Sequence, residues 1–353
     1  MSLCRDRTSI TLKEVKIAQI GLGAWGKNLL RNFMAQPAAR VVIVCDESPE
    51  ALEAAARSYP GVEAVQDPFA VFSRADVDAV VIATPPASHF KLAMAAVEAG
   101  KDVFVEKPLV LSSADGTRLV ARADELGRVL MVGHIMVHHP ASLKLKEYID
   151  SGELGRIYYV YATRVNLGKV RDIENAMWSF APHDISLIVF LLGKRPVKVS
   201  AVGQAYLQKG IQDVAFVTLQ FPDDTLGHIH TSWLDPHKDR NLTVVGSKKM
   251  VLFDDTRATE KIKVYDKGVD ARQDYATYGE YLSLRTGDIV IPNVPTSEPL
   301  SLECRHFLEA VQSRTRPRSD GRSGLEVLRI LEAAQQSMDS GGKPVEPVWE
   351  DES

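Results

Sequence analysis

Three glycines near the start of the chain have the spacing of a phosphate-binding loop. Residues 21–26, Gly-Leu-Gly-Ala-Trp-Gly, form a G-x-G-x-x-G between an apolar run and a segment with helical periodicity. Gly21 permits a tight turn, Gly23 lets the backbone approach a pyrophosphate, and Gly26 lets the following helix pack close to its strand. The helix N-terminus offers free N–H groups to the phosphates. We therefore expect the whole loop to bind a dinucleotide: Gly21, Leu22, Gly23, Ala24, Trp25 and Gly26.

Asp46 indicates which dinucleotide the loop binds. It directly follows the next apolar run, residues 40–45, at the distance from the glycines where a ribose-binding acid is found. A carboxylate accepts hydrogen bonds from both ribose hydroxyls of NAD and repels the 2′-phosphate of NADP, so NAD is the expected cofactor. Two alternatives stay open. Asp46 could instead cap a helix that begins near Pro49, and Arg57 could fold back towards the ribose and favour NADP.

Two further polar turns follow apolar runs later in the chain. Residues 84–86, Thr-Pro-Pro, are followed by His89, and residues 106–108 are Glu-Lys-Pro. Ligands of parallel sheets bind beyond the carboxyl ends of the strands, so we expect cofactor contacts here. A lysine beside a nicotinamide could polarise a hydroxyl or carbonyl group. The expected contacts are Thr84, Pro85, His89, Glu106 and Lys107, although His89 is equally explicable as an ordinary residue at a helix start and surface Glu-Lys pairs are common.

Alternating elements must position these turns. Apolar runs at 15–20, 40–45, 62–65, 77–83, 102–105 and 128–132 alternate with helical segments at 24–34, 49–59, 68–72, 88–99 and 112–126. This rhythm predicts a doubly wound parallel sheet of the Rossmann type with helices on both faces. In the first helical segment the predicted buried face is Ala24, Trp25, Leu29, Leu30, Phe33 and Met34.

The second half of the chain predicts an α+β domain with an open sheet. Segments 156–166, 197–207, 213–221 and 225–234, with shorter ones at 242–245, 250–253 and 261–265, are rich in β-branched and aromatic residues. Helices at 301–313 and 324–337 are expected to cover one face of this sheet, and 266–299 is interpreted as a loop near the substrate. We expect a cofactor domain over 12–134 and a domain for substrate binding and oligomerisation over 135–353.

Composition excludes several other classes of protein. The 353 residues are 45% hydrophobic and 25% charged, with a net charge of −4 and both signs mixed, which argues against nucleic acid as a partner. Residues 1–14 have no apolar core, and the longest apolar run, 185–192, is too short to cross a bilayer. Cys4, Cys45 and Cys304 are isolated, which is typical of a reducing cytoplasm. The pairs His138-His139 and His228/His230 have no matching third ligand, so no metal is expected.

With the glycine loop, the Thr-Pro-Pro turn and Glu-Lys-Pro in this order, the chain resembles the Gfo/Idh/MocA oxidoreductases. Residues 134–140 and 152–157, Gly-Glu-Leu-Gly-Arg-Ile, extend the resemblance, which covers about Val15 to Met338. It implies an NAD-binding Rossmann domain followed by a large, mostly antiparallel sheet through which subunits pair as homodimers or homotetramers. It also implies that Lys107 is a catalytic residue beside the nicotinamide and that Pro108 is cis.

A third stretch, residues 176–188, carries His183 in a helix that is expected to begin around Pro182. The resemblance implies that His183 faces Lys107 across the nicotinamide and accepts the hydroxyl proton; from the residues alone it could be an ordinary histidine at a helix start. Many relatives have an aspartate where this chain has Ser179. Because serine carries no charge at neutral pH, a charged relay there is not expected. Asp184 is interpreted as a substrate or structural contact.

The sequence around His183, together with residues 166–168 (Asn-Leu-Gly) and Trp178, is similar to the sequences of family members that oxidise position 3 of UDP-N-acetylglucosamine. The implied substrate residues are Lys107, Asn166, Trp178, Ser179, His183 and Asp184. Arg164, Lys169 and Arg171 could contact a diphosphate or could be solvated surface residues. We expect an NAD-dependent dehydrogenase acting on a secondary hydroxyl of a sugar. The alternatives are another sugar or polyol dehydrogenase, a hydrolase that recycles its NAD, and a regulator that binds NAD without catalysis.

Overall fold

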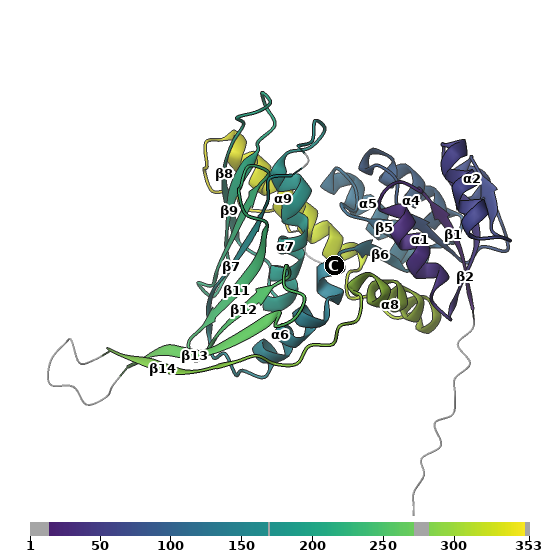
Figure 1. The fold of residues 1–353 in the computed structure, drawn as a ribbon. Coiled ribbons are helices and arrows are strands. Elements are labelled where there is room, and N and C mark those ends of the chain that lie inside the picture. Colours follow the sequence, from purple (N-terminus) through teal and green to yellow (C-terminus); the bar gives the residue numbers. More distant parts are fainter. Residues whose placement is uncertain (1–13, 169, 272–281, 350–353) are drawn as a thin grey trace, which may run out of the picture. The chain divides into compact units, whose positions relative to one another are not determined.

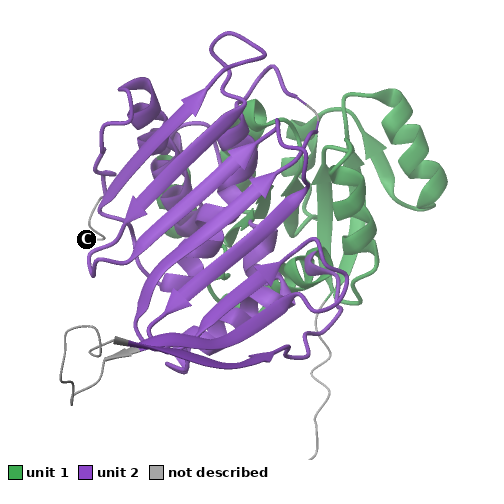
Figure 2. Cartoon of the chain, turned by 60° about the vertical axis from the view of Figure 1, so that its left-hand side comes forward, with its two compact units in different colours: residues 1–106, 118–133, 300–320 green, residues 107–117, 134–299, 321–353 purple. Residues whose placement is uncertain are grey.

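The computed structural model describes residues 14–168, 170–271 and 282–349, and the chain divides into two compact units (Figures 1 and 2). Unit 1 comprises residues 1–106, 118–133 and 300–320; unit 2 comprises 107–117, 134–299 and 321–353. A single division at 134/135 therefore differs from these units at residues 107–117, 134 and 300–320. Cys4 and Lys169 lie outside the described residues.

Unit 1 contains a six-stranded parallel sheet in the order β3-β2-β1-β4-β5-β6. The strands are β1 (Val15–Ile20), β2 (Ala39–Cys45), β3 (Glu63–Val65), β4 (Ala79–Ile82), β5 (Asp102–Glu106) and β6 (Leu130–Gly133). Every residue of β4 and β6 is buried, as expected for parallel strands covered on both faces. The strand order reverses between β1 and β4, which is where ligands of such sheets bind. The predicted doubly wound sheet is confirmed.

The helices of this part are α1 (Gly26–Met34), α2 (Pro49–Ser58), α3 (Pro68–Phe72), the 3₁₀ turn η1 (Pro86–Ser88), α4 (His89–Glu98) and α5 (Ser113–Glu125). Helix α1 buries Leu29, Leu30 and Phe33 as predicted. The prediction that Ala24, Trp25 and Met34 share this buried face is wrong, because all three are exposed. Ala24 and Trp25 precede the helix, and Met34 is its last residue.

Helix α8 (Pro299–Ser313) packs in unit 1, so the prediction that it covers the second sheet is wrong. The Phe307 ring lies edge-on to Phe33 and Phe104, with centroid distances of 6.2 and 5.7 Å. The Gln36 amide also donates to the main-chain oxygen of Ser301 at 3.0 Å. An amphipathic pattern predicts that one helix face is buried but not which sheet buries it.

Unit 2 contains an eight-stranded sheet in the order β14-β13-β12-β11-β7-β10-β9-β8. Its strands are β7 (Ile157–Val165), β8 (Lys198–Gln204), β9 (Val214–Gln220), β10 (Leu226–Ser232), β11 (Asp239–Gly246), β12 (Met250–Asp254), β13 (Ile262–Ala271) and β14 (Leu282–Val290). Only β7 and β10 pair in parallel among these strands, which confirms the mostly antiparallel sheet.

The interpretation of 266–299 as a loop is wrong, because β13 continues to Ala271 and β14 pairs with it. Strand β14 lies at the edge of the sheet, and Leu284 and Ile289 on it are exposed. None of the described side chains of β14 is fully buried, so no buried face imposes an alternation of apolar and polar residues, and the sequence signal was weak.

One face of this sheet is covered by helices, and Figure 2 shows the other face uncovered. The helices are η2 (Ile135–His138), α6 (Pro140–Asp150), α7 (Ala176–Leu192) and α9 (Gly321–Asp339). Ile188 of α7 and Leu331 of α9 belong to one buried cluster with Val160 and Val217 of the sheet, so the prediction for the last helix is confirmed.

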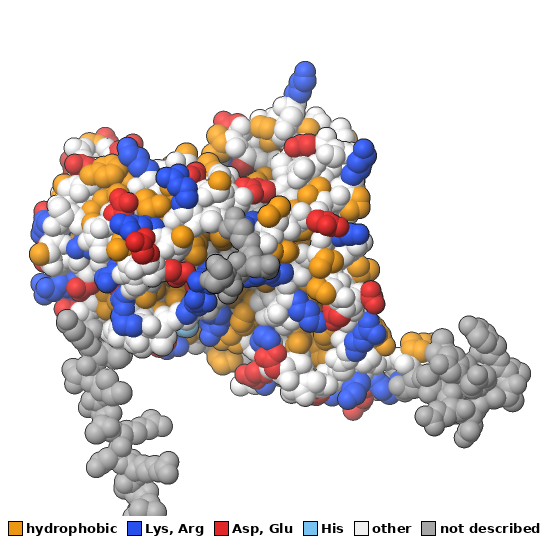
Figure 3. Space-filling model, turned by 180° about the vertical axis from the view of Figure 1, so that it is seen from behind, with side chains coloured by type: hydrophobic (Ala, Val, Ile, Leu, Met, Phe, Trp, Pro, Cys, Tyr) orange, Lys and Arg blue, Asp and Glu red, His pale blue; other side chains and the backbone are white. Residues whose placement is uncertain are grey.

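Among the described helices, none is long and apolar enough to cross a membrane. Basic and acidic side chains are interspersed over the surface seen in Figure 3.

Candidate functional site

The glycine loop connects β1 to α1 and is shaped by close backbone packing. Gly21 has φ +96°, and a Cβ there would lie 2.5 Å from the Ala83 carbonyl oxygen. A Cβ at Gly26 would collide with the Gly21 carbonyl, whereas a Cβ at Gly23 would meet nothing within 4 Å. Gly21 and Gly26 are thus required by packing, and Gly23 leaves the backbone accessible. This arrangement fits a bound pyrophosphate.

Gln19 holds this loop and was not expected from the sequence. Its buried side chain on β1 donates through Nε2 to the carbonyl oxygens of Gly21 at 3.1 Å and Gly26 at 2.7 Å. The amide therefore ties the first glycine of the loop to the last. The available signal was a glutamine among the apolar residues 17–20 at the end of the strand, because a buried polar side chain needs partners.

Asp46 lies beside the glycine loop. Its carboxylate accepts the main-chain N–H of Leu22 at 2.6 Å and that of Ser48 at 2.9 Å. The side chain that caps α2 is Ser48, which accepts from Ala51 N, so capping does not explain Asp46. A carboxylate has further lone pairs, so Asp46 can still accept hydrogen bonds from a ribose. Arg57 pairs with Glu53 along α2 at 3.6 Å.

The Thr84 turn is braced by its own side chains. The hydroxyls of Thr84 and Ser88 are hydrogen-bonded at 2.7 Å, and Ser88 Oγ also donates to the Pro85 carbonyl at 2.8 Å. The buried His89 ring donates from Nε2 to the Thr84 carbonyl at 2.9 Å. These contacts favour the structural interpretation of His89, which fixes the turn at the carboxyl end of β4.

Glu106, at the end of β5, accepts a hydrogen bond from the indole N–H of Trp25 in the glycine loop. Gly133 at the end of β6 makes room for it, because a Cβ there would lie 2.9 Å from the Glu106 carboxyl group. Glu303 on α8 is fully buried, and neither of its carboxyl oxygens has a hydrogen-bond partner among the described residues. Burial, and secondly the charge of Glu106, raise the pKa of Glu303 well above its usual value. Nothing in the sequence indicated this buried carboxyl group.

Lys107 belongs to unit 2, where it contacts the helix that carries His183. The Lys107-Pro108 peptide is cis, as the resemblance implied. The Lys107 ammonium donates to the main-chain oxygen of Ser179 at 3.1 Å. Ser179 lies one helical turn before His183 in α7. The structure therefore brings the lysine to the same turn of the helix as the predicted proton acceptor.

Helix α7 begins earlier than predicted. The expectation that it starts around Pro182 is wrong, because Asn175 caps it by accepting Trp178 N at 3.0 Å and Pro182 lies inside the helix. Pro182 has no N–H to bond with the carbonyl four residues earlier, which loosens the preceding turn. Lys107 donates to a carbonyl of this same turn. The Trp178 indole N–H donates to Oε1 of Gln335 at 3.2 Å.

Asp184 and Arg164 form a buried ion pair. The guanidinium donates to both carboxylate oxygens, at 2.8 and 2.9 Å, and both side chains are almost inaccessible to solvent. Asp184 thus makes a structural contact between α7 and β7, and Arg164 is not a solvated surface residue.

Arg171 pairs with Glu174 at 2.7 Å. Asn166, just beyond β7, donates its N–H to the Ser232 carbonyl at 3.2 Å.

Two imidazoles in unit 2 interact with Lys107. His183 is partly exposed, but its Nδ1 is buried and has no partner among the described residues. Burial, followed by the charges of Lys107 and Arg164, lowers the pKa of His183 well below its ordinary value. His134 is 2% exposed, and burial together with Lys107 lowers its pKa to about 3. Both rings are therefore neutral at physiological pH, and a neutral ring can accept a proton. His134 was not among the predicted site residues.

A dinucleotide loop on a doubly wound sheet, with a lysine and a neutral histidine in the second unit, defines a nicotinamide-dependent oxidoreductase. Two family models match the chain. The first, described as an oxidoreductase family with an NAD-binding Rossmann fold, matches residues 15–134. The second, the Gfo/Idh/MocA C-terminal domain, matches residues 142–252. The chain belongs to the Gfo/Idh/MocA family of NAD-binding oxidoreductases.

Individual relatives agree with this assignment. The scyllo-inositol 2-dehydrogenase (NAD(+)) of Bacillus subtilis is 28% identical over 86% of this chain and 88% of its own. The UDP-N-acetylglucosamine 3-dehydrogenase of Acidithiobacillus ferrooxidans is also 28% identical, over 90% of this chain and 94% of its own. A crystal structure of a protein from Magnetospirillum magnetotacticum MS-1 is 31% identical, with a TM-score of 0.78, and covers 91% of this chain and 100% of that one. The two named dehydrogenases are equally similar, so identity alone does not select a substrate.

Proposed function

We propose that this protein is a dehydrogenase that oxidises a secondary hydroxyl group of a sugar or polyol. The observation that carries the proposal is the hydrogen bond from Lys107 to the turn of α7 that bears His183. The neutral His183 ring accepts the hydroxyl proton, and the Lys107 ammonium stabilises the negative charge that develops on the oxygen. NAD, when bound, supplies the acceptor for the hydride. Gly23 and Asp46 are proposed to hold its pyrophosphate and ribose.

The lowered pKa of His183 has two consequences for this chemistry. The ring stays in its accepting form over a wide pH range, but it is a weaker base than an ordinary histidine. Lys107 compensates, because the charge that lowers the imidazole pKa also favours ionisation of a hydroxyl bound beside it. Ser179 presents its main-chain oxygen to Lys107 and cannot serve as a charged relay.

For the substrate, we propose position 3 of a UDP-linked amino sugar as the first candidate. The residues around Asn166, Trp178 and His183 support it, together with the Acidithiobacillus relative. An inositol is the second candidate, and one observation favours it. Arg164, which the sequence left open as a diphosphate contact or a solvated surface residue, is buried and paired with Asp184. A substrate without phosphate needs no such cation.

The test is NADH formation, followed by absorbance, with NAD and a panel that includes UDP-N-acetylglucosamine, scyllo-inositol and simple sugars. We expect NADH to accumulate with at least one of them. Release of a cleaved sugar without NADH would support the hydrolase that recycles its cofactor. Binding of NAD with every sugar unchanged would support the non-catalytic regulator. Either result would overturn the proposal.

We also propose that the protein self-associates through the uncovered face of its eight-stranded sheet, as a homodimer or homotetramer. Tyr159 and Tyr161 of β7 are exposed and stack at 6.2 Å, and His230 stacks on the exposed Phe216 ring at 4.5 Å. The Phe216 ring also stacks on His228 at 6.3 Å, so both histidines are accounted for as residues of a sheet face. Exposed aromatic patches are typical of subunit interfaces. Light scattering should give a mass of two or four times the 38.9 kDa of one chain; a monomer at micromolar concentration would overturn this proposal.

A further inference from the structure

His134 is a buried polar side chain that no contact within the described protein explains. It is 2% exposed, and neither Nδ1 nor Nε2 has a hydrogen-bond partner among the described residues. Leaving a buried polar group unpaired is costly, and native proteins seldom do so without a functional reason. Other buried histidines of this chain are paired: His89 donates to the Thr84 carbonyl, and His139 accepts the Ala141 N–H at 3.0 Å.

The position of His134 relates this ring to the catalytic pair. It immediately precedes η2, which packs against α7, and its carbonyl accepts the Val137 N–H at 3.1 Å. Lys107 acts electrostatically on His134 and on His183, and His134 also acts on His183. His134 is therefore a third polar group of the Lys107–His183 cluster, all three in unit 2.

The number of unpaired atoms indicates what His134 binds. A neutral imidazole has one N–H donor and one acceptor nitrogen. The hydroxyl being oxidised has a single proton, which His183 takes, so that hydroxyl cannot also donate to the acceptor nitrogen of His134. A second hydroxyl can. A metal ion is a poor alternative, because the Lys107 ammonium repels it and the described residues contain no group of three metal-ligating side chains.

We propose that His134 binds a second substrate hydroxyl on the carbon next to the one that is oxidised, so that the enzyme selects vicinal diols. His134 acts as a positioning and specificity residue: it orients the ring so that the reacting hydroxyl meets His183 and Lys107. This inference rests on the proposed dehydrogenase function, because it assigns His134 a role in binding the substrate. It also predicts a binding preference that can be measured without turnover.

The experiment measures binding to the full-length protein saturated with NADH, so that no turnover is needed. The probes are trans-1,2-cyclohexanediol, 1,4-cyclohexanediol and cyclohexanol, titrated by calorimetry. We expect the wild type to prefer the 1,2-diol by roughly 10-fold or more, the usual effect of leaving a buried polar group unpaired. His134→Phe keeps a ring of similar size but removes both nitrogens, and it should abolish this preference.

The matched control is His306→Phe on α8, where the imidazole accepts the Arg318 N–H at 2.9 Å. It should lower stability without changing the diol preference. A preference that persists in His134→Phe, a wild type that treats the three probes alike, or the absence of any binding would each overturn the inference. The NADH assay of the preceding section reports separately on the dehydrogenase function. Turnover without diol preference would remove only the role of His134.

Discussion

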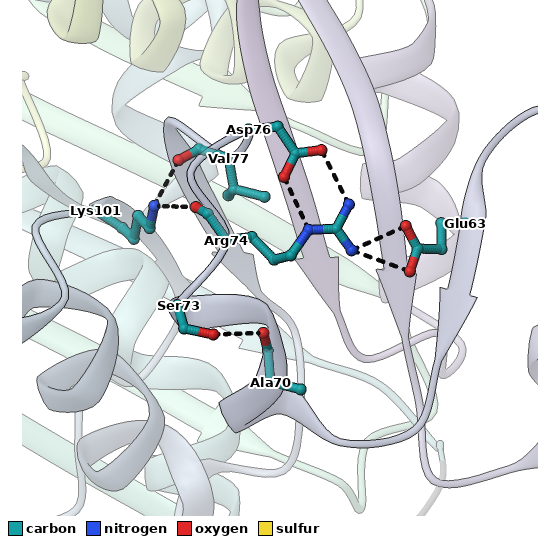
Figure 4. A network of polar contacts seen from close by, with 7 residues as sticks. All are labelled: Glu63, Ala70, Ser73, Arg74, Asp76, Val77 and Lys101. Atoms are coloured by element: carbon teal, nitrogen blue, oxygen red, sulfur yellow. Dashed lines mark hydrogen bonds and ion pairs between the residues drawn. The ribbon is translucent and has the colours of Figure 1, made fainter.

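Two polar clusters of this molecule differ in how completely their groups are paired. In unit 1, the Lys101 ammonium donates to the carbonyls of Arg74 at 2.6 Å and Val77 at 2.8 Å, and Arg74 bridges Asp76 and Glu63 (Figure 4). Arg74, Asp76 and Val77 precede β4, Lys101 precedes β5, and Glu63 is the first residue of β3, so the network lies at the amino ends of these strands. In unit 2, by contrast, His134 and His183 keep buried nitrogens without partners among the described residues.

The comparison separates structural from functional polar groups. The Lys101 network satisfies its donors within the protein, so it contributes to stability and offers nothing to a ligand. In the second cluster, His134 and His183 have ring nitrogens without partners among the described residues, which a substrate can satisfy, and such sites sacrifice stability for binding. Changes in the first cluster should therefore alter unfolding, and changes in the second should alter turnover.

The largest expected effect is that of His183→Asn. Asparagine keeps a polar group of similar reach but cannot accept the proton, so kcat/KM should fall by roughly 10²- to 10⁴-fold. Steady-state NADH formation measures the loss, and an unchanged affinity for NAD serves as the control. A variant that retains a tenth of wild-type activity would remove His183 from the role of base.

Lys107→Met should follow, with a loss of roughly 10²- to 10³-fold in kcat, because one donor to the developing oxyanion is removed. Methionine preserves the apolar stem, so folding is expected to persist. The same assay applies, with the thermal midpoint as a check on folding. Comparable turnover in this variant would contradict the proposed stabilisation of charge.

Lys101→Met tests the other side of the comparison. Removal of the ammonium leaves two main-chain carbonyls without their donor, which should lower the free energy of unfolding by about 1–3 kcal/mol. Urea denaturation measures the change, and kcat should be unaffected. Arg74→Met is the companion variant; its ion pairs are partly exposed to solvent, so a smaller change is expected. If Lys101→Met lowered kcat without lowering stability, the distinction between a structural and a functional cluster would be wrong.

Glu303→Gln should stabilise the protein in a pH-dependent way. The pKa of Glu303 is raised in the folded state, so the folded protein retains a proton that the unfolded chain releases above its ordinary pKa of 4.5. Stability of the wild type therefore falls as pH rises above that value, by at most about 1.4 kcal/mol per pH unit, and the variant escapes this loss. Unfolding at pH 4.5, 6 and 7.5 measures it. The exposed Glu309→Gln on the same helix should show no such trend.

The smallest expected effect is in the pH profile of the wild type. Because the pKa of His183 is lowered, its accepting form persists below pH 6.5, and kcat/KM should stay level as pH falls from 7 to 5.5. An ordinary histidine of pKa 6.5 would lose roughly 10-fold over that range. A decline centred near 6.5 would show that the base is solvated.

Much of unit 1 could be predicted because its determinants are local. The glycine loop, Asp46 and the six strands follow from spacing and from uninterrupted apolar runs. What could not be predicted depends on contacts between distant segments. Whether α8 packs beside Phe33 and Phe104 is decided by the shape of a core that no single helix encodes.

The predicted site contained the residues whose side chains are reactive. It lacked the residues that matter because of the groups around them in the fold. Lys107 and His183 were expected, and their shared helical turn is found. Gln19 and His134 were missed, because their importance lies in what their polar atoms contact or fail to contact. Pro182 was misread as a helix start, since a proline signals a boundary more often than an interior position.

The interleaving of the two units bears on how the chain can be divided. The chain passes from one unit to the other after residues 106, 117, 133, 299 and 320. A fragment ending at residue 134 would lack the Phe307 ring that closes the aromatic cluster, and one beginning there would lack Lys107. No single cut yields a self-sufficient half. Expression of either portion alone should give insoluble or unstructured material, and gene fusions that exchange one half between relatives would need several junctions rather than one.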